Sequence, residues 1–491
     1  MSPELMLNYV SCPQNSAELS SKKSSSDPAE TVASAITWQP LSTLLATLTH
    51  GNGLALAKSY TQDYEVSRCE VTDGALPVID LSYARSDLIN ITAITDNVTA
   101  ANSATFGYAA ANRLSTAAGP WGGQGWAYDG VGNRTSETAT PPGGSATTDT
   151  YAYASTSNRI ETVTRGAQTV RLFAYDAAGN IVSDARSGST YAYTYNAAGR
   201  LKTVSYEGNL KGTYVYNGLE QLITRVITNS GTLDGTIHTV HDRSGNVIAE
   251  IDAAGQTVRE YVWLPEGGYA GTDPGSGSGA GLPLAVVDGV NTASPVTYHV
   301  HADHLGRPIR MTDATKAAVW QATWQPWGAP QSITGSLVLN HRFPGQWFQL
   351  ESGLHYNWHR HYDPSLGRYT QPDPLGFVDG PAVFAYASGN PLEFVDFLGL
   401  SPETPSGPVI IDPRTGQQVY PPPQSGPTRP GTLQPPPLPP IPPKPTCEGF
   451  LQACMVKCTK YPLCKAHKAV DLACRAACLA GYYFCKKKSG D

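Results

Sequence analysis

Aromatic and polar residues alternate in short runs that recur along the first half of the chain. Most runs read aromatic, any residue, Tyr, then Asp or Asn, a small turn, and an aliphatic residue. Alternation with a period of two predicts half-buried strands, and the Asp/Asn-x-x-Gly centre predicts a tight turn between them. Each unit is therefore expected to be a β-hairpin, and the stacked hairpins a long ribbon of sheet. The units lie at 106–114, 126–134, 151–160, 173–181, 193–201, 214–222 and 238–247.

The second aromatic of each unit is expected to pack in a core rather than to bind sugars. It falls at Tyr108, Tyr128, Tyr153, Tyr175, Tyr195 and Tyr216, with His241 next, at steps of 20 to 25 residues. A period of this length is typical of repeat architectures, in which each unit buries its apolar face against its neighbours.

Composition divides the chain into unlike zones. The 491 residues include 48 Gly and 39 Pro but only 15% charged residues, which excludes a long helical bundle or coiled coil. The net charge of −6 predicts no overall attraction to nucleic acid or to a membrane. Residues 401–446 hold 17 prolines, which predicts an extended linker, with an SH3-type ligand as the alternative. Residues 1–35 are polar and Ser-rich and are expected to be disordered.

The repeat units resemble the YD repeat of the Rhs (rearrangement hotspot) family. Residues 298–313 (YHVHADHLGRPIRMTD), 342–362 (RFPGQWFQLESGLHYNWHRHY) and 363–400 are similar to the family's conserved C-terminal region, the Rhs-repeat-associated core. The resemblance covers roughly 36–400 and implies a mainly β fold, in which the ribbon spirals into a cocoon-like shell. Because the family's shells use longer repeat arrays, we expect a partial shell that partner chains complete, or a fragment of a larger protein.

Composition and the resemblance together predict how the chain is divided. We expect a disordered N-terminal segment (1–35), a repeat shell (36–297), a self-cleaving core that plugs the shell (298–400), a proline-rich linker (401–446) and a cysteine-rich tail (447–491). The implied function is that of an Rhs-type polymorphic toxin, or its C-terminal fragment, that encloses and releases a C-terminal effector in interbacterial competition or toxin delivery. The alternative is a non-enzymatic surface or interaction protein whose tail is a binding module.

Partners and export follow from the same resemblance. A secretion system or shell-completing chains and an immunity protein are the implied partners, with no nucleic acid. Residues 1–23 lack a basic region leading into an apolar run, so no cleavable signal peptide is expected. We therefore expect a protein made in the bacterial cytoplasm and exported without a classical signal peptide.

Two aspartates carry the candidate chemistry. Asp373 and Asp396 are the first residues of the motifs DPLGF and DFLGL, and 18 residues separate the two motifs. This spacing resembles the family's self-cleavage motif, which implies catalysis by the two carboxylates, with Arg368 orienting them. Two adjacent carboxylates share a proton, so one activates water while the other polarises the carbonyl. Phe397 and Phe377 depart from the family's Pro and Leu, and the alternative is that both aspartates only cap turns.

The cut implied by the resemblance falls between Leu400 and Ser401 and releases residues 401–491. No turnover enzyme beyond this autoproteolysis is expected. Asp363, in the word Tyr-Asp-Pro, is expected to be structural. His355, His359 and His361 form an HxxxHxH pattern that suggests zinc, but the neighbouring aromatic residues favour packing in a strand. His301 and His304 are likewise interpreted as turn residues, so no metal or cofactor is expected.

Seven of the nine cysteines lie in the tail, residues 447–491. Their spacing is symmetric and places two trios on helix faces, which predicts a helical hairpin joined by disulfides Cys447–Cys485, Cys454–Cys478 and Cys458–Cys474. Cys464 is left over, and a zinc site is the alternative. The tail carries a net charge of +5, which suggests contact with an anionic membrane or an acidic partner, or simply a solvated basic face.

Overall fold

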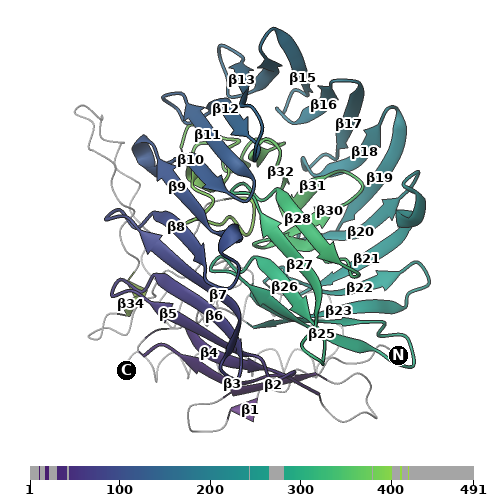
Figure 1. The fold of residues 1–491 in the computed structure, drawn as a ribbon. Coiled ribbons are helices and arrows are strands. Elements are labelled where there is room, and N and C mark those ends of the chain that lie inside the picture. Colours follow the sequence, from purple (N-terminus) through teal and green to yellow (C-terminus); the bar gives the residue numbers. More distant parts are fainter. Residues whose placement is uncertain are drawn as a thin grey trace, which may run out of the picture. The chain divides into compact units, whose positions relative to one another are not determined.

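The strands of the chain follow one another in one antiparallel meander. The computed structural model describes residues 10–11, 17–21, 30–40, 42, 44–242, 244–264, 281–378, 380–400, 410–411 and 418–419. Over these residues 28 strands form one large sheet, five form a second sheet and two form a separate pair. Each pairing in the large sheet joins consecutive strands (Figure 1). The predicted mainly β fold is confirmed.

The first 14 strands of the large sheet are β1 (Val10–Ser11), β2 (Ala17–Ser21), β3 (Glu30–Trp38), β4 (Leu45–His50), β5 (Ala55–Tyr60), β6 (Val66–Asp73), β7 (Leu76–Arg85), β8 (Ile91–Asp96), β9 (Ala104–Tyr108), β10 (Leu114–Gly119), β11 (Gly122–Tyr128), β12 (Arg134–Thr140), β13 (Thr147–Tyr153) and β14 (Ile160–Arg165). The next 14 are β15 (Gln168–Tyr175), β16 (Ile181–Arg186), β17 (Ser189–Tyr195), β18 (Leu201–Tyr206), β19 (Asn209–Tyr216), β20 (Leu222–Ile227), β21 (Gly235–His241), β22 (Val247–Asp252), β23 (Thr257–Leu264), β24 (Leu282–Asp288), β25 (Val296–Ala302), β26 (Pro308–Thr312), β27 (Ala318–Trp324) and β28 (Pro330–Gly335).

The second sheet comprises β29 (His341–Phe343), β30 (Gln346–Gln349), β31 (Leu354–Asn357), β32 (Arg360–Asp363) and β33 (Arg368–Tyr369). The separate pair is β34 (Ile410–Ile411) with β35 (Gln418–Val419). Helices among the described residues are four short 3₁₀ turns, η1 (Ala100–Asn102), η2 (Ala110–Asn112), η3 (Gly231–Leu233) and η4 (Ala387–Gly389). None of the helices in this described part has the length and apolar character needed to cross a membrane.

The repeat units form hairpins, as their alternation predicts. In the unit at 173–181, β15 ends at Tyr175 and β16 begins at Ile181, and these two residues are paired in register. Asp176 builds the turn: its carboxylate accepts the backbone N–H of Asn180 at 2.9 Å and the Asn180 side-chain amide at 2.8 Å. Gly179 has φ of +94°, a conformation that glycine adopts without strain.

The two aromatics of each unit have different roles. The first enters the core, where Tyr151, Phe173, Tyr193 and Tyr214 are at most 8% exposed. The second lies at the border of the core, and its hydroxyl donates to a backbone carbonyl at the start of an earlier strand. These bonds, called here the tyrosine ladder, are Tyr108 to Ile91 (2.7 Å), Tyr128 to Leu114 (2.6 Å), Tyr153 to Arg134 (2.7 Å), Tyr175 to Ile160 (2.9 Å), Tyr195 to Ile181 (2.7 Å) and Tyr216 to Leu201 (2.8 Å).

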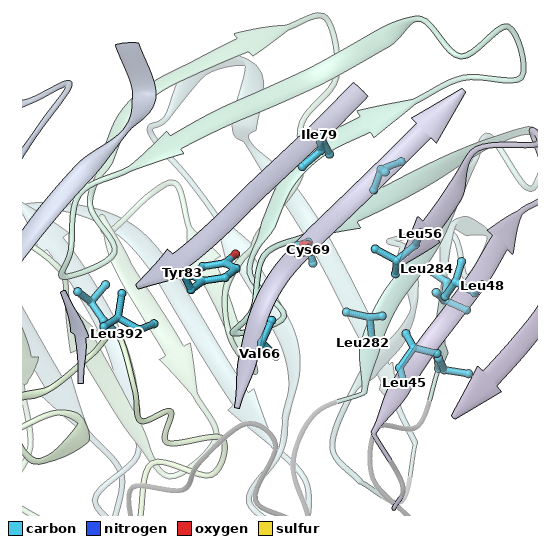
Figure 2. Packing of buried hydrophobic residues seen from close by; sticks show 14 of the residues in the cluster. Leu45, Leu48, Leu56, Val66, Cys69, Ile79, Tyr83, Leu282, Leu284 and Leu392 are labelled. Atoms are coloured by element: carbon cyan, nitrogen blue, oxygen red, sulfur yellow. The ribbon is translucent and has the colours of Figure 1, made fainter. Parts of the chain in front are cut away.

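The later strands of the meander pack against the earlier ones. Leu282 and Leu284 of β24 belong to one buried cluster with Leu45 and Leu48 of β4, as Figure 2 illustrates. Leu392, from the segment that ends at residue 400, joins the same cluster. Apolar burial therefore ties the beginning of the ribbon to its later strands and to the last described part of the core.

Polar groups also meet where β4 lies against β25. The rings of His50 and His301 are 4.5 Å apart and those of His50 and His299 are 5.7 Å apart, both edge to face. Asn52, just after β4, donates its amide to Thr312 Oγ1 at 3.0 Å. We call His50, His299 and His301 the histidine seam.

The second sheet packs against the middle of the meander (Figure 1). Tyr356 of β31 accepts the backbone N–H of Leu222 at 2.9 Å, and Arg171 of β15 forms an ion pair with Asp363 of β32 at 2.9 Å. Asp363 also accepts the backbone N–H of Ser365, as expected of a structural turn residue. This sheet carries part of the candidate site, so the repeat strands hold that site in place.

The meander extends beyond the limits expected from the sequence. β3 begins at Glu30, and Val32 and Ala33 are fully buried, so ordered ribbon starts within the segment expected to be disordered. The same sheet continues past residue 297 through β28 to Gly335. Apart from β34 and β35, the expectations for the proline-rich linker and the cysteine tail, Cys464 included, concern residues outside the described part of the chain.

Burial lowers the pKa of most imidazoles in the described chain. The pKa falls to about 3 for His50, His341, His355 and His361, to about 4 for His241, His299 and His304, and is also lowered for His301 and His359. Burial raises the pKa of four carboxyl groups, Glu65, Glu260, Asp373 and Glu393, the last to about 7. Carboxyl groups with a raised pKa stabilise the folded chain as the pH falls, whereas imidazoles with a lowered pKa destabilise it. The imidazoles outnumber the carboxyl groups.

We predict that the full chain loses stability as the pH falls from about 7.5 to about 5.5. An imidazole titrates near 6.5 when unfolded, so below that pH the unfolded chain binds more protons, at up to about 1.4 kcal/mol per pH unit for each buried group. The urea midpoint, followed by tryptophan fluorescence, should therefore fall. An unchanged or higher midpoint at the lower pH would contradict this prediction.

We predict that Tyr175→Phe lowers the free energy of unfolding by about 1 kcal/mol, because the carbonyl of Ile160 loses its donor while the ring stays. The control is Tyr191→Phe, since the Tyr191 ring stacks on Tyr193 and ring packing survives the change. Equal urea midpoints for the two variants would argue against the ladder.

Candidate active site

Arg360 brings the two predicted aspartates together. Its Nη2 lies 3.1 Å from Asp373 Oδ2 and 3.0 Å from Asp396 Oδ2. The side chains of Arg360, Asp373 and Asp396 are only 2%, 6% and 2% exposed. One cation thus lies between two buried carboxylates, which would repel each other without it.

Asp396 is surrounded by hydrogen-bond donors. Its Oδ1 accepts the backbone N–H of Leu400 at 2.9 Å, and its Oδ2 accepts the hydroxyl of Tyr369 at 2.7 Å as well as Arg360. The backbone carbonyl of Asp396 accepts the side-chain amide of Asn357 at 2.6 Å. Asp396 does cap a turn, as the alternative interpretation proposes, but the same carboxylate also contacts the arginine.

The backbone before residue 400 is held between Arg360 and Asp396. Arg360 Nε donates to the carbonyl of Gly399 at 2.6 Å, while Asp396 holds the next amide, that of Leu400. Gly399 has φ of +68°, and a Cβ there would lie 2.4 Å from the carbonyl oxygen of Asn357. Only glycine fits this approach. Ser401 lies outside the described residues.

Asp373 differs from Asp396 in its environment. Burial raises the pKa of Asp373 above its ordinary value, Asp396 adds to the rise, and Arg360 and the N–H of Leu375 oppose it. A cavity of about 170 Å³ adjoins both carboxylates and Arg360, with Val383 and Ser388 among its other lining residues. The cavity has room for several water molecules beside the two acids.

Arg368 lies apart from the carboxylates. It donates to Asn158 O at 2.7 Å and to the hydroxyl of Tyr153 at 3.2 Å, and its guanidinium lies 4.7 Å from the ring centre of Phe384. The arginine that contacts Asp373 and Asp396 is Arg360. Arg368 instead attaches β33 to the repeat strands.

The two phenylalanines that depart from the family pattern differ in burial and contacts. Phe397 packs over Gly345, where a Cβ would come within 2.8 Å of its ring. Phe377 is 76% exposed. Asp396 thus contacts Arg360 and Leu400 even though the next residue, Phe397, is not the proline of the family pattern.

Two models of known families match this chain. The model described as RHS protein matches residues 297–331, and the model described as RHS Repeat matches residues 175–211. The second match begins at Tyr175 and contains β16, β17 and β18. Both are models of Rhs proteins, so the Rhs resemblance of the sequence is confirmed over these residues.

The Rhs chain is similar to curated toxins. Double-stranded DNA deaminase toxin A of Burkholderia cenocepacia is 29% identical over 287 residues, which cover 49% of this chain and 20% of that protein. Toxin protein Tse5 of Pseudomonas aeruginosa is 29% identical over 255 residues, which cover 46% of this chain and 18% of that protein. The chain thus spans about a fifth of the length of these relatives.

Solved structures share the Rhs fold. The Photorhabdus luminescens Tc holotoxin pore matches with a TM-score of 0.62 at 17% identity, over 79% of this chain and 20% of that one. The crystal structure of TcdB2-TccC3 matches with the same TM-score, identity and coverage. At this identity the likeness establishes the fold alone.

The histidine-rich stretch of the Rhs core forms a hairpin rather than the single strand expected. Trp358 has φ of +45° and lies in the turn between β31 and β32. The two strands therefore pair His355 with Tyr362 and His361 with Tyr356. His355 and His361 therefore face opposite sides of the sheet, while His359 contacts Arg200. Among the described residues no group of three or more His, Cys, Asp or Glu is arranged to hold a metal ion.

The other two predicted histidines lie in and beside the expected turn. His304 contacts the carbonyl of Leu392 at 2.9 Å, and His301 contacts Thr312 Oγ1 at 2.9 Å. Asp303 builds this turn through the N–H of Leu305 at 3.0 Å.

Sequence reasoning missed Arg360, Tyr369 and Asn357. The resemblance implied Arg368 instead, because it matches an arginine of the family just before the first aspartate motif. The sequence offered one signal for Arg360: it is a charged residue within an aromatic segment that is expected to form a buried strand. A charged side chain in such a strand needs a buried partner. Choosing that partner required the tertiary fold.

We predict that Arg360→Met destabilises the Rhs core by about 3–5 kcal/mol, because two buried carboxylates lose their shared cation. Arg368→Met should cost less, since Arg368 forms its hydrogen bonds with neutral groups. Urea midpoints measure both. Adding Asp373→Asn and Asp396→Asn should restore much of the stability of Arg360→Met, and equal losses for the two arginine variants would contradict the prediction.

Proposed function

We propose that this chain is part of an Rhs-type polymorphic toxin whose core cuts its own backbone between Leu400 and Ser401. One observation carries the proposal: Arg360 bridges Asp373 and Asp396, and Asp396 also holds the amide of Leu400. Two acids and a cation thus converge beside the peptide group that precedes the expected cut. Turn capping alone would not require a buried arginine between the acids.

The two aspartates divide the acid and base roles. Asp373, with its raised pKa, supplies a proton. Asp396 faces three donors, Leu400, Tyr369 and Arg360, and a carboxylate has about four lone-pair positions, so one remains for a water molecule. Asp396 is therefore the base.

The proposed reaction is peptide hydrolysis. Asp396 takes a proton from water, whose oxygen bonds to the carbonyl carbon of Leu400. As that carbon becomes tetrahedral, Asp373 protonates the carbonyl oxygen. Asp396 then gives the proton it took from water to the nitrogen of Ser401 as the C–N bond breaks, and Asp373 takes its own proton back from a hydroxyl of the intermediate. The products are a carboxyl group on Leu400 and an amine on Ser401. Arg360, bonded to Gly399, keeps the chain in register and offsets the negative charge.

The repeat ribbon and the released segment have separate roles in this proposal. Residues 30–400 contribute wall and plug to a shell, and residues 401–491 are the cargo, whose cysteine tail forms the disulfides predicted above. Support comes from the toxin relatives and from the likeness to Tc structures that contain several chains. The chain spans about a fifth of these proteins, so further sequence or partner chains would complete the shell, and export would follow a dedicated route.

Intact-mass spectrometry of the denatured full-length protein tests the cut. We expect the wild-type chain to yield two species, ending at Leu400 and beginning at Ser401, and Asp373→Asn to remain whole. Reduction should increase the mass of the smaller species by the hydrogens of three disulfides.

The matched control is Asp252→Asn. Asp252 also builds an Asx turn, accepting the N–H of Ala254, and Asn196 fills the same role elsewhere in the ribbon, so this variant should still cut. A wild-type chain that stays intact after folding would overturn the proposal and favour a non-enzymatic interaction protein. Toxicity of the released tail in an oxidising compartment would separately support the cargo role.

A further inference from the structure

The phenol of Tyr369 and the amide of Asn357 both contact Asp396. Tyr369 is fully buried, as is Asn357. Asn357 Nδ2 donates to Tyr369 Oη at 2.7 Å, and Tyr369 Oη donates to Asp396 Oδ2 at 2.7 Å. The same amide also donates to the backbone carbonyl of Asp396 at 2.6 Å. Asp396 is therefore held at both its side chain and its backbone.

The direction of these hydrogen bonds follows from the partners. The carbonyl of Asp396 can only accept, so the nitrogen of the Asn357 amide must face it. That nitrogen then donates to Tyr369, which leaves the hydroxyl proton of Tyr369 for Asp396. Successive donation in one direction polarises each bond toward the carboxylate.

This arrangement leaves one polar atom unsatisfied. In the described structure, the Oδ1 of Asn357 is buried and has no hydrogen-bond partner. An unsatisfied buried carbonyl costs roughly as much as a hydrogen bond contributes, so a side chain kept in this position for stability alone is a poor choice. The placement is explained if Asn357 serves to orient its two partners.

Tyr369 also positions Arg360. The guanidinium carbon of Arg360 lies 3.7 Å from the centre of the Tyr369 ring, in a cation–π contact. The ring thus supports the cation that bridges the two acids, while the hydroxyl fixes one of those acids. These two contributions can be separated, because phenylalanine keeps the ring and removes only the hydroxyl.

We propose that Tyr369, oriented by Asn357, is a positioning residue for self-cleavage. Its hydroxyl fixes the Asp396 carboxylate so that Oδ1 holds the N–H of Leu400 while Oδ2 faces Arg360. This inference rests on the proposed function, since it assigns a role within the same cut. Tyr369 acts through Asp396, which its hydroxyl contacts.

The test compares Tyr369→Phe with Tyr362→Phe in the full chain. Tyr362 is equally buried, and its hydroxyl donates to the carbonyl of Trp327 at 2.7 Å, away from both acids. Each protein is made by translation in vitro and diluted into buffers of different pH. The fraction cut is then followed with time on denaturing gels.

We expect Tyr369→Phe to slow the cut by roughly tenfold or more, the effect of losing one hydrogen bond to a charged group. The acid side of its pH–rate profile should move to higher pH. The reason is that the Asp396 carboxylate loses one of the hydrogen bonds that stabilise its ionised form. Tyr362→Phe should keep the wild-type profile. A purely structural role would lower the urea midpoint of both variants without moving either profile.

Asn357→Ala provides a second variant in case Tyr369→Phe fails to fold. It removes the donor to Tyr369 and should slow the cut in the same way, and the double variant should be no slower than the slower single variant. Wild-type cleavage together with an unchanged rate and pH profile in Tyr369→Phe would overturn this inference. An intact wild-type chain would instead overturn the proposed function.

Discussion

Each of the six hairpins of the tyrosine ladder is joined to the preceding hairpin by a hydroxyl-to-carbonyl hydrogen bond, and the course of this part of the ribbon depends on the repeated contact. Pairing between β14 and β15 reaches only as far as Thr162 and Leu172, so the carbonyl of Ile160 lies beyond the backbone ladder. Tyr175 supplies the missing donor. Without that hydroxyl a carbonyl at the border of the core would lack a partner, which is costly away from water.

The same position in each repeat also bends the sheet. The register of the β15–β16 pair shifts between Ala174 and Tyr175, and the β13–β14 and β17–β18 pairs shift just before Tyr153 and Tyr195. An extra residue in one strand increases the local twist and curves the ribbon. A repeated bulge, closed each time by a tyrosine, turns a flat meander into a wall that can curve around the second sheet.

Buried charges join that wall to the second sheet. Arg171 of the ribbon pairs with Asp363, and Arg225 lies 3.6 Å from Glu351. Buried ion pairs contribute little net stability, but breaking one leaves an isolated charge, so they penalise any other register between wall and sheet. The Arg360 bridge follows the same rule, with the difference that its two carboxylates also adjoin a cavity.

Local residue patterns were sufficient to predict the hairpins, their turns and the mainly β fold, because alternation and Asx turns act over a few residues. The aspartate pair and its spacing were also visible in the sequence. The roles of Arg360, Tyr369 and Asn357 depended on the tertiary structure, because β31 to β33 bring them to Asp396 across gaps of 27 to 39 residues. A linear pattern determines which side chains are available, while burial and strand pairing decide which of them meet a charge.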